Sequence, residues 1–173
     1  MADDPKYMVK PLGQEDRAAF HCGDPELDSY FHQRASRDMR EKLSAVFVLV
    51  WKAQPDVVLG YYTLSAQQVD AGELPEDLKK RTGKYKRIGV TLMGRLAVAK
   101  EHQGQQLGAL LLVDGLRRSL QGTRNVMSFA VVVDAKSDIV AKFYERFGFV
   151  RLSGNRLMLP MKTVERNFQP KDN

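Results

Sequence analysis

The sequence has a single cysteine and no long apolar run, and these two features exclude whole classes of protein. Cys22 is the one cysteine among 173 residues, so no disulfide can form within the chain. No uninterrupted apolar stretch approaches the roughly 20 residues that a membrane-spanning helix needs. The first ten residues, MADDPKYMVK, start with acids and lack the basic-then-apolar order of a secretory signal. We therefore expect a cytoplasmic protein with no membrane span.

Patterns for a metal site and for a cysteine nucleophile are also missing. His21, His32 and His102 lack metal-ligand spacing with one another or with other ligands, so we predict no bound metal. Cys22 has no His–Asp partner pattern around it, and we interpret it as a small packing residue. Trp51 is interpreted as a core or interface residue.

The length and composition predict one globular domain. The chain is long enough to bury one sizeable core and too short for two ordinary domains. It contains no internal repeat, no low-complexity tract and no linker that would divide it. We therefore expect a single domain over residues 1–173, and its patterns predict a mixed α/β order.

The first forty residues predict a short strand and an amphipathic helix. Residues 7–12 form the strand. The helix begins after Asp24, which can cap its free backbone N–H groups, with Pro25 at the first helical position. It is expected to run for about 16 residues. Its apolar side chains recur at four-residue steps: Leu27, Phe31, Ala35 and Met39.

A hairpin and a third long strand follow. Residues 46–51 and 57–66 read as antiparallel strands, and Pro55 and Asp56 between them favour the turn. Residues 90–99 predict another strand. The order so far is strand, helix and three strands.

The last third of the chain predicts two helices and three strands. One helix starts after Gly108 and ends near Gly122, with its apolar face predicted on Ala109, Val113, Leu116 and Leu120. Residues 128–134 form a strongly apolar strand, and residues 137–148 a helix of about ten residues. Two short strands over residues 150–161 end the pattern.

The segment HQGQQLG, residues 102–108, lies between a predicted strand and a predicted helix. Several unpaired backbone N–H groups converge at a helix N-terminus, where the helix dipole is positive. Glycine lets the backbone approach a phosphate without a side chain in the way. The segment therefore predicts an anion-binding loop.

Two stretches, LAVAKEHQGQQLGALLL and AKFYERFGFV, together resemble the GNAT acetyltransferase superfamily. The resemblance covers residues 90–150 and combines a strand, a phosphate loop, a helix, a second strand and an aromatic helix end. It implies an α/β (α+β) fold in which a central mixed, mostly antiparallel sheet is flanked by helices. It also implies an acetyl-CoA-dependent N-acetyltransferase.

The resemblance assigns acetyl-CoA to the same loop and to the strand before it. Backbone N–H groups of the loop would hold the pyrophosphate, and the strand would pair with the pantetheine amides. The residues concerned are Leu96, Ala97, Val98, Gln103, Gly104, Gln105, Gln106, Leu107, Gly108 and Ala109. Gln106 stands where the family usually has glycine, and this leaves two alternatives: a helical backbone at this position, or weaker acyl-CoA binding than is typical. We expect the helical conformation, since helix N-terminal turns do not require glycine at every position.

By the same resemblance, Tyr144 is the general acid that protonates the departing thiolate. A free tyrosine titrates near 10 and a thiol near 8.5, so that proton transfer is uphill by about 2 kcal/mol. No general base is evident in the sequence. Glu41, Asp134 and Asp138 are the carboxylates considered, each read first as a surface or capping group. An α-amine has a pKa near 8 and is partly neutral at pH 7, so it depends less on a general base than a lysine amine does.

Three further stretches look like the GNAT toxins of bacterial toxin–antitoxin pairs, which acetylate aminoacyl-tRNA. They are FHCGDPELDSYFHQRA, LGYYTLSA and MGRLAV. This resemblance implies an aminoacyl-tRNA acceptor, a homodimer and a ribbon-helix-helix antitoxin as partner. The segment KYKRIGVT lacks the prolines common in those toxins, so a different acceptor stays open.

The net charge of +6 is concentrated in KKRTGKYKR, residues 79–87. Such a run is either a solvated loop or a surface that attracts phosphates. The second interpretation assigns Lys84, Lys86 and Arg87 to RNA binding. Two other functions remain open: acetylation of a small amine or a protein amine, and a noncatalytic module that binds CoA or nucleic acid.

Overall fold

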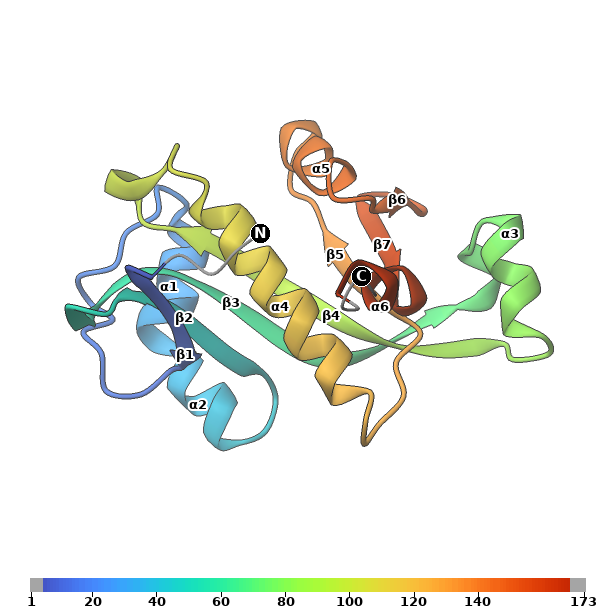
Figure 1. Ribbon diagram of the computed structural model, residues 1–173, viewed down its shortest axis with the longest axis horizontal. Helices are drawn as coiled ribbons and strands as arrows, with labels where there is room; N and C mark the ends of the chain where they lie inside the picture. The colour runs from blue at the N-terminus through green and yellow to red at the C-terminus, as the bar shows by residue number, and fades with distance from the viewer. Residues whose placement is uncertain (1–4, 169–173) are drawn as a thin grey trace, which may run out of the picture. The chain divides into compact units, whose positions relative to one another are not determined.

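The computed structural model describes residues 5–168, and within them seven strands form one sheet in the order β1-β2-β3-β4-β5-β7-β6 (Figure 1). The β4–β5 pair is parallel, whereas β1–β2, β2–β3, β5–β7 and β6–β7 are antiparallel. The predicted mixed, mostly antiparallel sheet is thus confirmed. The strands are β1 (Tyr7–Pro11), β2 (Ala45–Trp51), β3 (Gln54–Asp70), β4 (Arg87–Val98), β5 (Ala130–Asp134), β6 (Val150–Arg151) and β7 (Arg156–Pro160).

Helices connect these strands. The α-helices are α1 (Pro25–Gln33), α2 (Ala35–Arg40), α3 (Glu76–Lys79), α4 (Leu107–Gly122), α5 (Asp138–Glu145) and α6 (Met161–Phe168). The 3₁₀ turns are η1 (Ala71–Glu73), η2 (Lys80–Thr82) and η3 (Lys100–His102). No helix among residues 5–168 combines the length and the apolar character needed to cross a membrane.

The backbone divides into two compact units. Within the described residues, the first unit comprises residues 5–65 and Met93–Gly115, and the second comprises Ala66–Leu92 and residues 116–168. Three elements, β3, β4 and α4, contribute residues to both units. The single domain over residues 1–173 stays a prediction.

In the first unit, the predicted long helix is two shorter ones. Asp24 caps α1 as predicted, because its side chain accepts hydrogen bonds from the N–H groups of Glu26 and Leu27. The helix breaks at Arg34, whose backbone leaves helical geometry at φ −120° and ψ −24°. The predicted apolar face is nevertheless correct on both sides of the break, since Phe31 and Ala35 are fully buried.

The turn of the β2–β3 hairpin lies earlier than predicted. Trp51 pairs with Gln54, so the turn is Lys52–Ala53, and Pro55 and Asp56 lie inside β3. Register shifts on both sides of Val50 absorb the extra residues. The predicted turn was therefore wrong, because a proline near a strand end can be accommodated beside a bulge.

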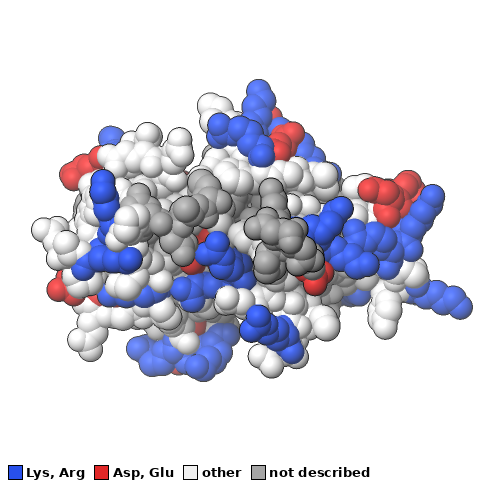
Figure 2. All heavy atoms as spheres, in the orientation of Figure 1, with Lys and Arg blue, Asp and Glu red and all other residues white. Residues whose placement is uncertain are grey.

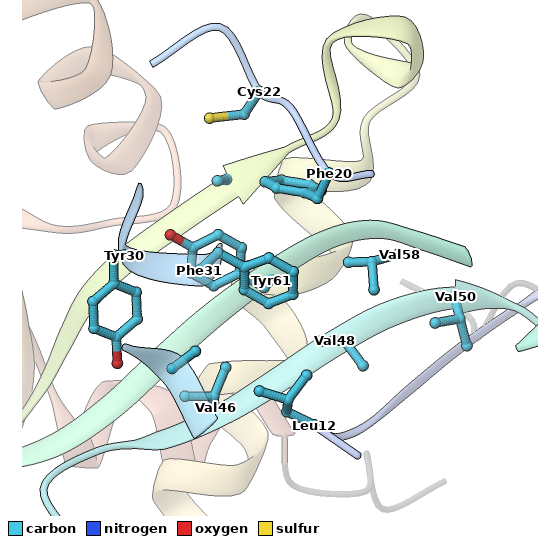
Figure 3. Close-up of a cluster of buried hydrophobic side chains, with 12 residues drawn as sticks. Leu12, Phe20, Cys22, Tyr30, Phe31, Val46, Val48, Val50, Val58 and Tyr61 are labelled. Carbon is cyan, nitrogen blue, oxygen red and sulfur yellow. The ribbon is translucent and has the colours of Figure 1, made fainter. Parts of the chain in front are cut away.

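An aromatic and aliphatic core fills the first unit (Figure 3). Tyr61 on β3 stacks on Phe31 with ring centroids 4.5 Å apart, and Phe20 meets both rings edge-on. The Tyr61 hydroxyl donates to the Leu27 carbonyl at 2.7 Å. These contacts hold α1 against β3.

The second unit has its own core. It is formed by Val69, Ala71, Leu74, Leu78, Ile88, Val90, Ala130, Val132 and Met158. Ser137 caps α5 as predicted, accepting from the N–H of Val140 at 3.2 Å. The final helix, α6, was not predicted, because the apolar run RLMLPM suggested a strand through Met161 and gave no sign of a helix start there.

Candidate functional site

The side chain of Gln103 ties the connection between β4 and α4 to two neighbouring segments. The Nε2 of Gln103 donates to the backbone carbonyl of Val98 at 3.0 Å and to that of Cys22 at 2.8 Å. Gln103 is otherwise exposed, as are Gly104, Gln105 and Gln106 after it. We call residues 103–109, which include the first turn of α4, the amide loop.

The amide loop presents a run of backbone donors with no protein acceptor. None of the six N–H groups from Gly104 to Ala109 donates a hydrogen bond to any of residues 5–168. The first internal bond of this turn is the one from Leu110 N to Gln106 O at 3.2 Å. A helix ordinarily leaves four such groups free. Six free donors at the positive end of a 16-residue helix form a site suited to an anion such as a pyrophosphate.

Gln106 corrects one prediction. Its φ is +63°, in the left-handed region, where Gly104 also lies at +81°. The helical conformation expected at Gln106 is therefore wrong. The chain reverses sharply just before α4 begins at Leu107, and that reversal needs the conformation that glycine adopts without strain. The cost for a residue with a side chain is on the order of 1–3 kcal/mol.

The N-terminal half of α4 packs on β3 through side chains, where β3 itself closely approaches β4. A Cβ at Gly60 would lie 2.8 Å from the Ala97 carbonyl oxygen and 2.8 Å from the Leu111 side chain. The Tyr62 hydroxyl donates to Asp114 at 2.6 Å. These contacts with β3 fix the position of the helix N-terminus.

The buried face of α4 differs from the predicted one. Ala109, Val113 and Leu120 are only partly buried, while Leu116 is buried as predicted. The buried stripe is the one that packs on β3 and β4, where Leu111 lies against Gly60 and Gly115 lies against Tyr62 and Met93. The buried positions are Leu107, Leu111, Leu112, Gly115, Leu116 and Ser119.

The strand residues assigned to the acyl donor lie in the same unit as the amide loop. The ladder between β4 and β5 consists of two residue pairs, Thr91–Val131 and Leu92–Val132. The following residues of β4 lie outside that ladder, and among them Leu96 and Val98 are half-buried while Ala97 is buried. Their backbone can thus offer hydrogen-bonding groups to an extended amide chain.

Tyr144 belongs to the second unit, at the end of α5. It is 6% exposed, and its ring packs against Phe143 and Phe149 with centroids 5.1 and 5.4 Å away. None of residues 5–168 forms a hydrogen bond with its hydroxyl. Burial raises the pKa of this phenol well above its ordinary value of 10. Tyr144 therefore carries its proton at every physiological pH.

The carboxylates considered as bases are engaged elsewhere or isolated. Asp134 accepts two hydrogen bonds from Arg156 at 2.8 Å, which lower the pKa of the carboxyl. Asp138 lies 2.7 Å from Arg151 and 3.3 Å from Lys142, and these bonds likewise lower its pKa. Glu41 is an exposed residue at the end of α2. A carboxylate with a lowered pKa is a poor proton acceptor near pH 7.

The cationic segment is structured rather than a loop. It spans the end of α3, the turn η2 and the first residue of β4, and Figure 2 shows its Lys and Arg side chains at the right of the view. Lys84, Lys86 and Arg87 are exposed, and Tyr85 between them is 75% exposed. Arg81 instead packs over the Phe129 ring at 5.2 Å. Three cations and an aromatic ring thus face solvent together on a short turn.

The remaining predictions concern metals, Cys22 and Trp51. No group of three potential metal ligands comes together in the described part of the chain. Cys22 is buried, and burial raises the pKa of its thiol to about 11, so it packs as predicted. Trp51 is partly buried between Tyr7 and His102, with ring centroids 4.6 and 6.2 Å away.

Comparison with known proteins identifies the family of this site. Residues 45–151 match the model of the acetyltransferase (GNAT) domain. A tRNA-acetylating toxin of Mycobacterium tuberculosis is 30% identical over 135 residues, which are 78% of this chain and 78% of the toxin.

Two solved structures show the same fold over nearly the whole chain. One is AtaT complexed with acetyl-methionyl-tRNAfMet, with a TM-score of 0.87 and 28% identity, covering 94% of this chain and 99% of AtaT. The other is a mutant AtaT toxin bound to the C-terminus of the antitoxin AtaR and to acetyl-CoA. It has a TM-score of 0.81 and 25% identity, and the match covers 95% of this chain and 99% of that one.

Proposed function

Because this chain belongs to the GNAT acetyltransferase family, we propose that it transfers the acetyl group of acetyl-CoA to the α-amino group of an aminoacyl-tRNA. The observation that carries the acyl-donor half of this proposal is the set of six free N–H groups in the amide loop. The acceptor half is supported by the relatives that acetylate or bind tRNA.

The amide loop fits the pyrophosphate of acetyl-CoA on chemical grounds. Its donors belong to the backbone, and its exposed side chains are uncharged. Gly104 and Gln106 both have a positive φ, a backbone geometry in which consecutive N–H groups can point toward one anion. Leu96, Ala97 and Val98 then bind the pantetheine amides through their backbone.

In the proposed reaction, the amine nitrogen attacks the thioester carbonyl, forming the N–C bond, and the C–S bond breaks. Tyr144 donates its proton to the departing thiolate, and the amine gives up its own proton to water. The buried phenol is a weaker acid than a free tyrosine. An apolar environment raises the pKa of a thiol as well, which limits the mismatch between the two groups.

Two of the three carboxylates named as possible bases are held by cations, and this favours an α-amine as the acceptor. Asp134 and Asp138 are held by cations that lower their pKa values. An α-amino group near pKa 8 is partly neutral at pH 7, whereas a lysine amine near 10.4 is almost wholly charged. An aminoacyl ester therefore needs no enzymatic base to become nucleophilic.

RNA binding is assigned to Lys84, Lys86 and Arg87. Exposed, clustered cations bind phosphates by releasing condensed counterions, and the exposed ring of Tyr85 offers a surface for stacking. Since charged tRNA is found in the cytoplasm, we place the protein there. As further partners we propose a second copy of the chain and a ribbon-helix-helix antitoxin, by analogy with the relative that binds an antitoxin.

The test is transfer of radiolabelled acetyl from acetyl-CoA to bulk charged tRNA. We expect label on aminoacyl-tRNA and almost none on free amino acid, because phosphate contacts remote from the amine position it. Neutralising Lys84, Lys86 and Arg87 together should weaken tRNA binding and flatten its salt dependence, with acetyl-CoA binding unchanged.

Other outcomes replace this proposal with a specific alternative. If no aminoacyl-tRNA is labelled while a polyamine or a lysine peptide is, the acceptor is a small or protein amine. If nothing is labelled although acetyl-CoA binds, the chain is a noncatalytic CoA-binding module.

A further inference from the structure

Tyr30 on α1 holds an arginine of β4 against its ring. The guanidinium carbon of Arg95 lies 3.5 Å from the ring centroid, a short cation–π contact. The ring itself is fixed, because Tyr30 is 2% exposed and its hydroxyl donates to Asp38 at 2.9 Å. Figure 3 shows Tyr30 at the edge of the buried cluster, beside Phe31 and Tyr61. Arg95 is therefore positioned with little freedom.

A second guanidinium lies over the same ring. The Arg34 guanidinium carbon is 5.2 Å from the Tyr30 centroid. The two guanidinium carbons therefore lie at most about 9 Å apart, which is the sum of their distances to that centroid. The guanidinium groups of Arg34 and Arg95 form no ion pair and no hydrogen bond with any of residues 5–168. The carboxylate of Asp38 already accepts a hydrogen bond from the Tyr30 hydroxyl.

Two unpaired guanidinium groups so close together repel each other and leave all their N–H donors available. An anion that accepts from both removes the repulsion. The planar fork of arginine matches the oxygens of a phosphate, and its orientation here is set in advance by the ring. All four residues concerned lie in the first unit.

We propose that Arg34 and Arg95 together bind one backbone phosphate of the RNA substrate. Arg95 immediately precedes Leu96, the first of the strand residues assigned to the acyl donor, so the phosphate bound here belongs to the 3′ end of the acceptor strand, near the reacting amine. This inference rests on the proposed aminoacyl-tRNA acceptor. The same chemistry could instead take the 3′-phosphate of CoA, and the experiment separates the two sources.

The test compares Arg95→Gln and Arg34→Gln with Arg37→Gln, a variant of an exposed arginine on α2 that contacts no described ring. Steady-state acetylation of charged tRNA is measured over a range of salt, together with calorimetric binding of CoA and dephospho-CoA. We expect KM for charged tRNA to rise about tenfold in each of the first two variants, with the salt slope smaller by about one. CoA binding should be unchanged, and Arg37→Gln should behave as wild type.

The remaining outcomes overturn the inference in distinguishable ways. A loss of CoA affinity with dephospho-CoA unaffected assigns the pair to the cofactor 3′-phosphate. A lower melting temperature with an unchanged salt slope makes Arg95 a packing residue only.

Arg95→Lys keeps the charge but loses the planar guanidinium. This variant should therefore keep the wild-type salt slope while its KM for charged tRNA stays raised. If the wild-type protein acetylates no charged tRNA, the proposed function itself is refuted. That result is measured on the wild type and is therefore separate from any result with the variants.

Discussion

The side-chain amide of Gln103 donates to the Val98 carbonyl at 3.0 Å, so the start of the amide loop is tied to the last residue of β4. The same nitrogen also binds the Cys22 carbonyl at 2.8 Å. This side chain thereby helps to set the position of the loop relative to the strand that precedes it.

Gln103→Ala should weaken acetyl-CoA binding about tenfold while the protein stays folded. Each lost hydrogen bond is worth about 0.5–1.5 kcal/mol, and 1.4 kcal/mol is a factor of ten in affinity. Calorimetric titration measures the change. Gln105→Ala is the control, because that side chain is exposed and bonds to none of the described residues. Equal affinities for the two variants would show that Gln103 does not hold the loop.

Gln106→Gly should stabilise the protein. Its φ of +63° is strained for glutamine and relaxed for glycine, a difference of about 1 kcal/mol. For a chain of this size, that corresponds to a melting temperature about 2–4 °C higher. Gln105→Gly, which has no positive φ to relieve, should lower the melting temperature slightly. If both glycine variants are destabilised, the left-handed conformation at position 106 is incorrect.

Gly60→Ala should destabilise the protein by about 1–3 kcal/mol, the usual range for overpacking. The new methyl would be 2.8 Å from the Ala97 carbonyl oxygen, a backbone atom that cannot move aside alone. Gly89→Ala on β4 has open space around it and should cost far less. Chemical denaturation of the two variants gives the comparison, and similar midpoints would contradict the close approach of β3 to β4.

Tyr144→Phe should lower turnover about 100-fold or more, the usual scale for losing a general acid, while acetyl-CoA affinity stays the same. Because burial raises the pKa of Tyr144 above 10, the wild-type acid remains protonated through pH 9. The rate should therefore rise from pH 6 to about 8, as the α-amine loses its proton, and should not fall by pH 9.

The control is Tyr85→Phe, at an exposed tyrosine on the cationic turn. It should retain wild-type turnover at saturating tRNA. Unchanged turnover in Tyr144→Phe would return that residue to a purely packing role with Phe143 and Phe149.

Local chemistry in the sequence predicted most elements. Asp24 and Ser137 cap the helices they were expected to cap, and the apolar spacing located the core face of α1 and α2. The break at Arg34 and the turn at Lys52–Ala53 were missed. The break depends on how α1 and α2 pack, and the turn depends on the register of β2 against the adjacent β3. Periodicity within one segment reports neither.

The site was predictable to a similar extent. The order of strand, glycine-containing loop and helix located the amide loop, but nothing local indicated that Gln106 would adopt a left-handed conformation. Arg95 was missed because its partner, Tyr30, is 65 positions away in the sequence. Stacking of a cation on a distant ring leaves no pattern in either segment.

The six unsatisfied N–H groups of the amide loop have a consequence for mutational surveys. Because the donors belong to the main chain, replacing the exposed Gln105 or Gln106 by alanine would leave ligand binding nearly unchanged, and such a scan would conceal the site. Alanine at the buried Leu107 would instead report on packing. Proline is the informative probe, since each insertion deletes one donor. Tolerance to alanine combined with intolerance to proline would be the genetic signature of this loop.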